Sequence, residues 1–325
     1  MKEEGGTDIT LSLNYRSSPK LVQYQRHFIN AFMRDPDSGI KSTITSYFRK
    51  DIENPVEIHR FKTDKVQNSE ILKMVESMLK TEPDKNIAII CRTNSECELF
   101  KKKLSKKNIQ SFRFSNESFS SIPEISEAIE SIKTKFGGEI PGEISIYLEL
   151  KEYLEYAVSD TGNAISLFLE YTLSLQESSL YDEPWKLLNA ISGSTFDDVY
   201  ARGLIPHGVI ISTVHKAKGK SFDTVIVPSV VEGNYPYTTS TRKNAILDDA
   251  RSFYVAISRA RSRLILTFFD KGRISYRTLE PLKKTSCKHK RAKVSVREHL
   301  ESQIVDTKPS RFIVRPRGIR YIEHS

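Results

Sequence analysis

The sequence of 325 residues contains only three cysteines, Cys91, Cys97 and Cys287, and their spacing fits no metal-binding motif. A small, odd number of cysteines also argues against a disulfide framework of the kind that stabilises small secreted proteins. We therefore expect reduced thiols and a cytoplasmic location.

Long hydrophobic runs are lacking as well. The apolar run at 225–231 is interrupted by Pro228, and no run approaches the roughly 20 residues that a membrane-spanning helix needs. The N-terminus carries Glu3 and Glu4 and no apolar segment of the kind found in signal peptides. The sequence therefore predicts no signal peptide and no membrane partner.

A third absence is the glycine-rich loop that holds nucleotide phosphates. Gly219-Lys220-Ser221 resembles its end, but the motif requires a glycine five positions before Gly219, where Val214 stands. In Gly39-Ile40-Lys41-Ser42, isoleucine stands where a glycine is required. No paired carboxylates and no His/Cys set with metal-ligand spacing are found either. We therefore expect neither a phosphate cradle nor a metal site in this chain, and no free-standing nucleotide hydrolase built on Lys220.

The positive charge is concentrated at the C-terminus. The formal net charge is +9, and the residues from Lys271 to the end hold 15 Lys/Arg against 5 Asp/Glu, a surplus of ten. Such a segment attracts polyanions, because binding releases their counterions. A solvated terminus without a partner is the other interpretation. The basic cluster comprises Lys283, Lys284, Lys288, Lys290, Arg291 and Lys293.

The hydrophobic pattern predicts an α/β fold. Apolar runs typical of buried strands alternate with stretches of helical spacing, which indicates parallel strands joined by crossover helices. The expected strands are 56–61, 87–91, 209–214, 223–231 and 264–269. One helix is expected to begin at Pro19, and three more are expected at 69–79, 95–104 and 247–261. Between 115 and 207 the pattern is mostly helical, at 122–132, 144–158 and 163–175, which predicts a helical insertion.

Several arginines stand where the partner would be either a carboxylate within the fold, which spacing alone favours, or a phosphate. Arg16 precedes an expected helix, at a position where anion sites often occur. Arg251 and Arg259 lie on the expected helix 247–261, about 12 Å apart and on roughly the same face at a rise of 1.5 Å per residue. Asp248 and Asp249 are interpreted as acidic residues that favour the N-terminal end of that helix.

Three segments together resemble a known family. Leu13-Asn14-Tyr15-Arg16-Ser17, the segment 213–222 and the segment 248–260 resemble the fourth, fifth and sixth motifs of the UvrD/Rep-like superfamily 1 DNA helicases, in that order. The segment 87–94 is similar to the strand and loop that follow the fourth motif. The resemblance implies a RecA-like parallel-sheet domain of the P-loop NTPase type, formed by 1–114 and 208–270. Residues 115–207 would be a helical insertion subdomain, and 271–325 a basic tail.

The same resemblance implies an ATP site. Tyr15 would stack on the adenine, and Arg16 and Arg259 would contact the γ-phosphate as catalytic residues, with Arg259 acting as an arginine finger. Gly219 would allow close approach of the backbone beside the nucleotide. Ser221 would face the ribose, where the family usually has a glutamate, so we expect the sugar to be held less firmly.

For nucleic acid, the resemblance implies that Thr213, His215 and Lys216 lie on the track of single-stranded DNA. Arg251 would bridge to neighbouring motifs.

The predicted function is the C-terminal part of an ATP-dependent DNA helicase or translocase, in a family with roles in DNA repair. The cofactors would be ATP and Mg²⁺, the latter bound mainly by an N-terminal half that this sequence does not include. Single-stranded DNA would be a partner. A separate chain would supply the front half, or the chain would be a truncated product that is inactive alone. The alternative is a non-catalytic nucleic-acid-binding or regulatory module derived from a helicase.

Overall fold

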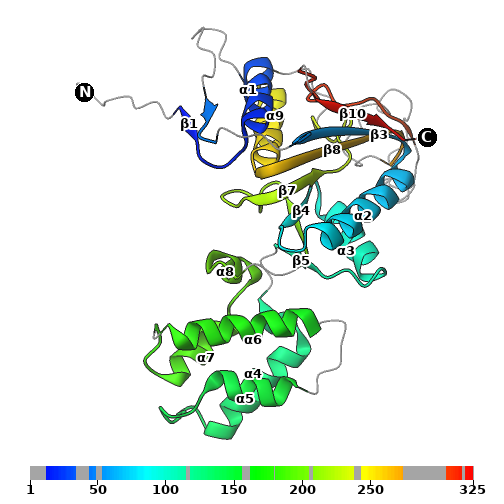
Figure 1. Ribbon diagram of the computed structural model, residues 1–325. Coiled ribbons are helices and arrows are strands. Elements are labelled where there is room, and N and C mark those ends of the chain that lie inside the picture. The colour runs from blue at the N-terminus through cyan, green and yellow to red at the C-terminus, as the bar shows by residue number, and fades with distance from the viewer. Residues whose placement is uncertain are drawn as a thin grey trace, which may run out of the picture. The chain divides into compact units, whose positions relative to one another are not determined.

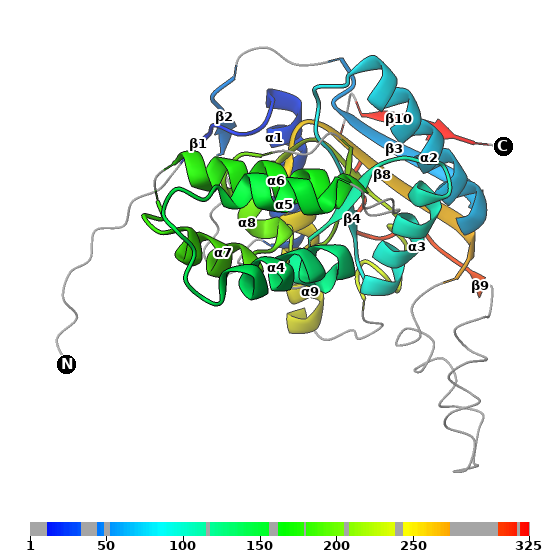
Figure 2. The same ribbon diagram turned by 90° about the horizontal axis from the view of Figure 1, so that it is seen from below.

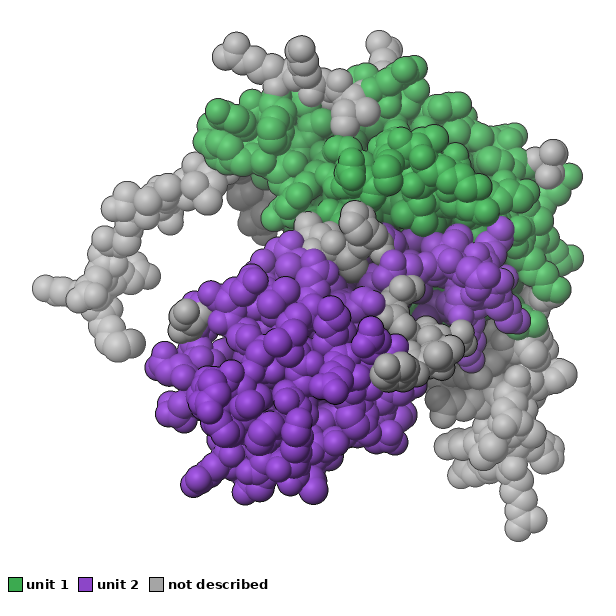
Figure 3. Space-filling view, turned by 60° about the horizontal axis from the view of Figure 1, so that its bottom comes forward, with its two compact units in different colours: residues 1–100, 212–325 green, residues 101–211 purple. Residues whose placement is uncertain are grey.

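The computed structural model describes residues 12–33, 44–48, 53–114, 118–155, 162–178, 180–204, 208–237, 243–273, 305–316 and 319–324. The chain divides into two compact units, which are drawn in green and purple in Figure 3. Unit 1 comprises residues 1–100 and 212–325, and unit 2 comprises residues 101–211. The predicted domain boundaries at 114, 207 and 270 stay predictions.

Unit 1 is built on a parallel sheet, which confirms the predicted α/β class. Neighbouring strands of this sheet pair in parallel in every case from β10 to β4. The order is β10 (Arg320–Glu323), β3 (Val56–Thr63), β8 (Ala260–Gly272), β7 (Phe222–Val227) and β4 (Ile87–Cys91). Two short strands, β1 (Leu13–Asn14) and β2 (Thr45–Ser46), form a separate parallel pair.

Helices α1 (Pro19–Phe32) and α9 (Lys243–Ile257) pack against each other and against one face of this sheet, and α2 (Asp64–Thr81) covers the other face (Figures 1 and 2). Helix α1 begins at a proline after Ser18, a residue order that favours a helix start. In α2 the cap is Thr63, whose hydroxyl accepts the N–H of Val66 at 3.2 Å. Helix α3 (Asn94–Ser105) follows β4.

The predicted helix 247–261 is wrong at both ends. Helix α9 begins at Lys243 and ends at Ile257, and β8 begins at Ala260. Arg259 therefore lies in the turn between helix and strand, not on a helix face. The apolar residues at 256, 257 and 260 continue the helical spacing of α9 by chance, so periodicity alone does not locate the break.

Unit 2 contains the helices of the central region. The predicted helices at 122–132, 144–158 and 163–175 correspond to α4 (Pro123–Phe136), α5 (Ile146–Leu154) and α6 (Gly162–Glu177). Two further helices, α7 (Pro184–Ser192) and α8 (Phe196–Ala201), were not predicted, and α8 is held by a capping box between Thr195 and Asp198. The short strands β5 (Ser111–Arg113) and β6 (Val209–Thr213) pair in parallel.

The predicted basic tail includes structured segments. Beyond β8, the chain forms β9 (Val305–Asp306), which pairs antiparallel with β8, and β10 at the edge of the sheet. Phe312 between them is fully buried. The basic cluster at 283–293 and Cys287 lie outside the described residues, whereas Cys91 and Cys97 are buried in unit 1.

Within the described segments, no helix combines the length and the hydrophobicity that a bilayer crossing would require.

A pair of histidines joins the edge strand to its neighbour. His59 Nδ1 lies 2.9 Å from His324 Nε2, and His59 Nε2 lies 2.9 Å from Glu57 Oε2. Burial and the nearby His59 charge lower the pKa of His324 from its ordinary value of 6.5, while Glu70 on α2 opposes this effect. The link between the rings needs at least one ring nitrogen without a proton.

We expect acid to weaken this edge of the sheet. Because the pKa of His324 is lower in the folded state, the unfolded chain takes up a proton first, so stability should fall as the pH drops below about 6.5. His324→Gln should flatten the pH dependence of the free energy of unfolding between pH 5 and 7, measured by denaturant titration. His27→Gln, at an exposed position on α1, is the control. An unchanged pH slope in His324→Gln would contradict the assignment.

Candidate nucleotide and nucleic-acid site

The segment 14–18 is fixed against the junction of α9 and β8. Asn14 Oδ1 accepts the backbone N–H groups of Arg16 and Ser17, each at 2.9 Å, and so closes a tight turn. The Ser17 hydroxyl donates to the Ala260 carbonyl at 2.7 Å, and the Ser18 N–H donates to the Arg261 carbonyl at 3.2 Å. Residues about 240 positions apart are thereby placed side by side.

This arrangement brings Arg16 and Arg259 together. Arg16 donates to the Ser258 carbonyl at 3.4 Å. Arg259 is held by three acceptors: the carbonyls of Val255 at 2.9 Å and Lys220 at 3.0 Å, and the Ser258 hydroxyl at 2.8 Å. Burial and the charge of Arg16 lower the pKa of Arg259 below its ordinary value.

The same two charges affect the pKa of Tyr254, which lies one turn before the end of α9. Burial raises the pKa of its phenol, while Arg259 and Arg16 oppose the rise. Within the described residues, no carboxylate forms an ion pair with Arg16 or Arg259. Two half-buried cations thus lie near each other, and no carboxylate of the described residues pairs with either.

An open pocket of about 620 Å³ adjoins Arg16. The residues that line it are Asn14, Tyr15, Arg16, Phe48, Ser221 and Arg261. Tyr15 is 63% exposed, and its ring centroid lies 4.7 Å from that of Tyr47. Arg261 Nε donates to the Ser221 hydroxyl at 3.2 Å. The lining offers aromatic surface, two cations and no carboxylate, a combination that suits a ligand with an aromatic ring and an anionic group.

The segment after β6 forms a compact turn. The Ala217 N–H donates to the Thr213 carbonyl at 3.0 Å, and the Lys218 N–H donates to the His215 carbonyl at 3.3 Å. His215 is exposed and Lys216 is half-buried. Gly219 has a φ of +84°, a conformation that glycine adopts more readily than other residues.

The turn meets the arginine pair at its far end, since the Lys220 carbonyl accepts from Arg259. Of the residues expected to bind nucleotide, Tyr15, Arg16 and Ser221 line the pocket, Arg259 lies beside Arg16, and Gly219 belongs to the adjacent turn. Thr213, His215 and Lys216 are not among the pocket residues.

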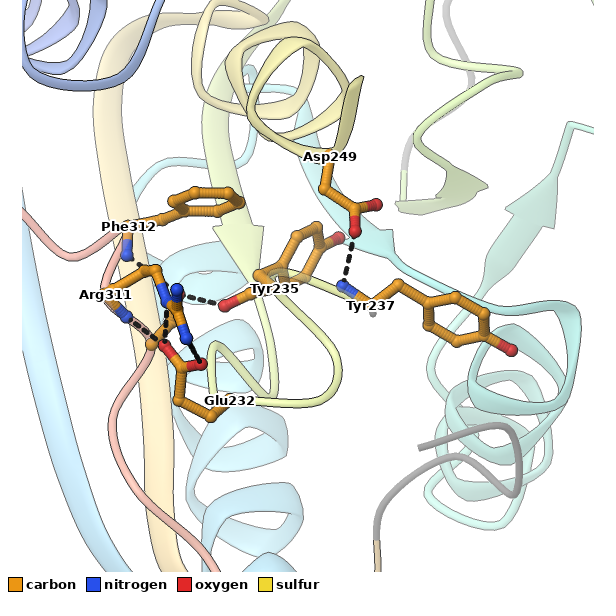
Figure 4. A network of polar contacts seen from close by, with 7 residues as sticks. Glu232, Tyr235, Tyr237, Asp249, Arg311 and Phe312 are labelled. Atoms are coloured by element: carbon orange, nitrogen blue, oxygen red, sulfur yellow. Dashed lines mark hydrogen bonds and ion pairs between the residues drawn. The ribbon is translucent and has the colours of Figure 1, made fainter. Parts of the chain in front are cut away.

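A second polar cluster was not predicted from the sequence. Arg92, which follows β4, forms a hydrogen-bonded ion pair with Asp249, and the two side chains are only 12% and 11% exposed. The guanidinium of Arg92 also lies 5.5 Å from the ring centroid of Tyr235 and 5.1 Å from that of Tyr237. Figure 4 shows the Tyr237 N–H directed at Asp249, a bond of 2.8 Å.

The interpretation of Asp249 as a helix N-terminal residue is therefore wrong. Helix α9 starts six residues earlier than Asp249, at Lys243, so Asp249 lies in the middle of the helix and its partner is Arg92. The two residues are 157 positions apart, and local spacing carries no signal for such a pair. Arg251 pairs at the surface with Asp248, at 2.9 Å.

Comparison with known proteins identifies the family. The sequence model of the UvrD-like helicase C-terminal domain matches residues 9–136 and 158–271, well over half of the chain. The chain belongs to this family. The match includes the segments that contain the arginine pair, the pocket and the turn at 213–219.

Full-length relatives are DNA helicases by name. The ATP-dependent DNA helicase UvrD2 of Mycobacterium tuberculosis is 21% identical over 286 residues, which cover 80% of this chain and 38% of the relative. The ATP-dependent DNA helicase Rep of Escherichia coli is 32% identical over 114 residues, 34% of this chain and 17% of the relative. This UvrD-like C-terminal domain thus spans well under half the length of these relatives.

A solved structure of the C-terminal domain of a possible DNA helicase from Lactobacillus plantarum aligns with 78% of this chain and 87% of its own length, at 14% identity and a TM-score of 0.38.

In the described part of this UvrD-like domain, no group of three or more His, Cys, Asp or Glu side chains could hold a metal ion.

The buried pair offers a direct stability test within the UvrD-like domain. Asp249→Ala leaves Arg92 buried without its anion, so we expect a loss of about 3–5 kcal/mol in the free energy of unfolding. Asp248→Ala is the matched control, because it removes an exposed i,i+3 pair and should cost about 0–1 kcal/mol. Denaturant titration of both variants measures the difference. Equal losses would contradict the assignment of Asp249 as a buried partner.

Proposed function

We propose that this chain forms one wall of the ATP site of a UvrD/Rep-type DNA translocase. In this proposal unit 1 is the second RecA-like domain, and the helices of unit 2 belong to an insertion subdomain. Tyr15 stacks on the adenine, Arg16 binds the γ-phosphate and Arg259 acts as the arginine finger. The observation that carries the proposal is the pairing of two half-buried arginines that no carboxylate neutralises within the described residues.

The electrostatics support this role. Holding two like charges together in a partly buried place is unfavourable, and a bound polyanion would offset this repulsion by attracting both charges. The guanidinium of Arg259 is oriented by two carbonyls and one hydroxyl, so it needs little rearrangement when charge develops on a transferred phosphoryl group. In well-studied nucleotide hydrolases such an arginine accelerates hydrolysis by about 10³–10⁵-fold.

Other parts of the reaction must come from elsewhere. The printed sequence contains no phosphate-loop motif, so a separate polypeptide segment would hold the triphosphate and most of the Mg²⁺ coordination. ATP would then lie between that segment and the wall formed here. Within this wall, Ser221 and Arg261 are the groups placed to contact the sugar or an adjacent phosphate.

For DNA, we propose that Thr213, His215 and Lys216 contact a single strand. They belong to the turn whose last carbonyl, that of Lys220, binds Arg259. In this proposal the hydrogen bond between Arg259 and the Lys220 carbonyl connects the nucleotide site to the DNA-contacting turn. Through this bond, ATP binding and hydrolysis would change how tightly the turn binds single-stranded DNA.

The ATP-wall proposal is tested with the chain itself. We expect it to bind a fluorescent ATP analogue weakly, and Arg259→Ala or Arg16→Ala to weaken binding about tenfold or more, since each removes a charged hydrogen-bond donor. Arg251→Ala, which removes a surface arginine on α9, is the control and should bind like the unaltered chain.

The same preparation should show no hydrolysis above background without a phosphate-loop partner. Brisk hydrolysis stimulated by single-stranded DNA in the chain alone would contradict the proposal, as would equal binding by Arg259→Ala and Arg251→Ala.

The alternative, a non-catalytic nucleic-acid-binding or regulatory module, is favoured by the surplus of ten basic over acidic residues from Lys271 to the end and by Ser221 at the expected ribose position. If the six basic residues at 283–293 contact phosphates, replacing them with glutamine should make the slope of log K against log[salt] shallower by up to about 4 for single-stranded DNA. Fluorescence anisotropy at several salt concentrations measures the slope. An unchanged slope would rule out this segment as the DNA contact.

A further inference from the structure

A short C-terminal segment, residues 309–314, packs against α1 and α9 through Phe312. It lies beyond residue 271, where the family match ends. Phe312 is fully buried, and its ring centroid lies 5.7 Å from that of Phe28 and 5.1 Å from that of Phe32, both on α1. It also lies 5.7 Å from the ring of Phe253 on α9, and the rings of Phe28 and Phe253 lie 5.2 Å from each other. One phenyl ring thus contacts both helices.

The segment is anchored by polar contacts to the loop after β7. Arg311 and Glu232 form a two-point ion pair, with Nε–Oε1 at 3.1 Å and Nη2–Oε2 at 2.8 Å (Figure 4). The Ser310 N–H donates to the Val230 carbonyl at 3.0 Å, and its hydroxyl donates to the carbonyl of Tyr235. Phe312 therefore enters the core at a fixed position.

The loop that receives this segment also reaches α9. The ring of Tyr235 is fully buried and lies 5.1 Å from that of Phe253. Two residues further on, the Tyr237 N–H binds Asp249. The C-terminal segment and the loop after β7 thus both contact α9, at Phe253 and at Asp249 one turn before it. Figure 4 shows Phe312, Tyr235 and Asp249.

Helices α1 and α9 each lead to one member of the arginine pair. Helix α1 starts at Pro19, three residues after Arg16, and α9 ends at Ile257, two residues before Arg259. At 1.5 Å per residue, the aromatic contact of Phe312 lies about 6 Å from the end of α9 and about 13 Å from the start of α1. A change in the spacing of these helices would move the two guanidinium groups relative to each other.

We propose that Phe312 is a positioning residue that sets the spacing of α1 and α9 and thereby the approach of Arg16 to Arg259. Its role in catalysis rests on the proposed ATP function, but its effect on the geometry does not. Removing the ring would leave a cavity between the helices, into which they would relax.

The experiment compares Phe312→Ala with Phe61→Ala by amide hydrogen exchange of the full chain. Phe61 is equally buried but lies on β3, where it stacks on His324 at 4.4 Å. We expect Phe312→Ala to speed exchange of the Ser18 and Arg259 amides about tenfold and Phe61→Ala to leave them nearly unchanged. Phe312→Leu, which keeps a large apolar side chain in the site, should restore most of the protection. Phe312→Val, which removes more of the ring's volume, replaces Phe312→Ala if that variant does not fold.

Equal exchange at these amides in Phe312→Ala and Phe61→Ala, or no change in Phe312→Ala (or in Phe312→Val where it is used instead), would overturn the positioning role. Binding of inorganic tripolyphosphate provides the second readout and should weaken in Phe312→Ala but not in Phe61→Ala. If the unaltered chain binds no tripolyphosphate but the exchange difference is present, the result supports the positioning role of Phe312 and contradicts the proposed ATP site.

Discussion

The enforced closeness of two arginine side chains is the constraint on which the rest of the structure depends. Arg16 and Arg259 lie 243 positions apart in the sequence, and both are half-buried. Burial and the charge of Arg16 lower the pKa of Arg259. Such closeness persists only if the backbone on both sides is held firmly. The turn closed by Asn14 and the bonds from Ser17 and Ser18 to the start of β8 provide that hold. The surrounding fold holds the backbone at both arginines in place.

Three sets of contacts in unit 1 hold the two arginines in place. The parallel sheet places the end of α9 and the start of β8 next to the turn after β6, so that Lys220 and Arg259 meet. The buried pair of Arg92 and Asp249 fixes the middle of α9. Phe312 fills the space between α1 and α9 from behind. Each of these contacts acts on α1 or α9, and one end of each helix lies two or three residues from an arginine of the pair. Distant parts of the sequence therefore affect one site.

Much of this fold could be predicted from the sequence, because its signals are local. The strand Ile87–Cys91 is apolar throughout and buried on both faces, and its predicted ends are correct. The turn at Arg259 was missed, because apolar spacing continues across it. The partner of Asp249 and the burial of Phe312 were missed because both depend on contacts between residues far apart in sequence. In the case of Phe312, the basic composition of the C-terminal region concealed an aromatic core residue. The arginine pair itself was predicted only through resemblance to a family.

The central claim is that Arg16 and Arg259 bind the same anion, and a double-mutant cycle tests it most directly. Tripolyphosphate affinity would be measured for the unaltered chain, Arg16→Ala, Arg259→Ala and the double variant. If both side chains contact one ligand, the losses should be non-additive, with a coupling energy of about 0.5–3 kcal/mol. Losses that add to within about 0.5 kcal/mol, or no loss in either single variant, would contradict a shared anion site.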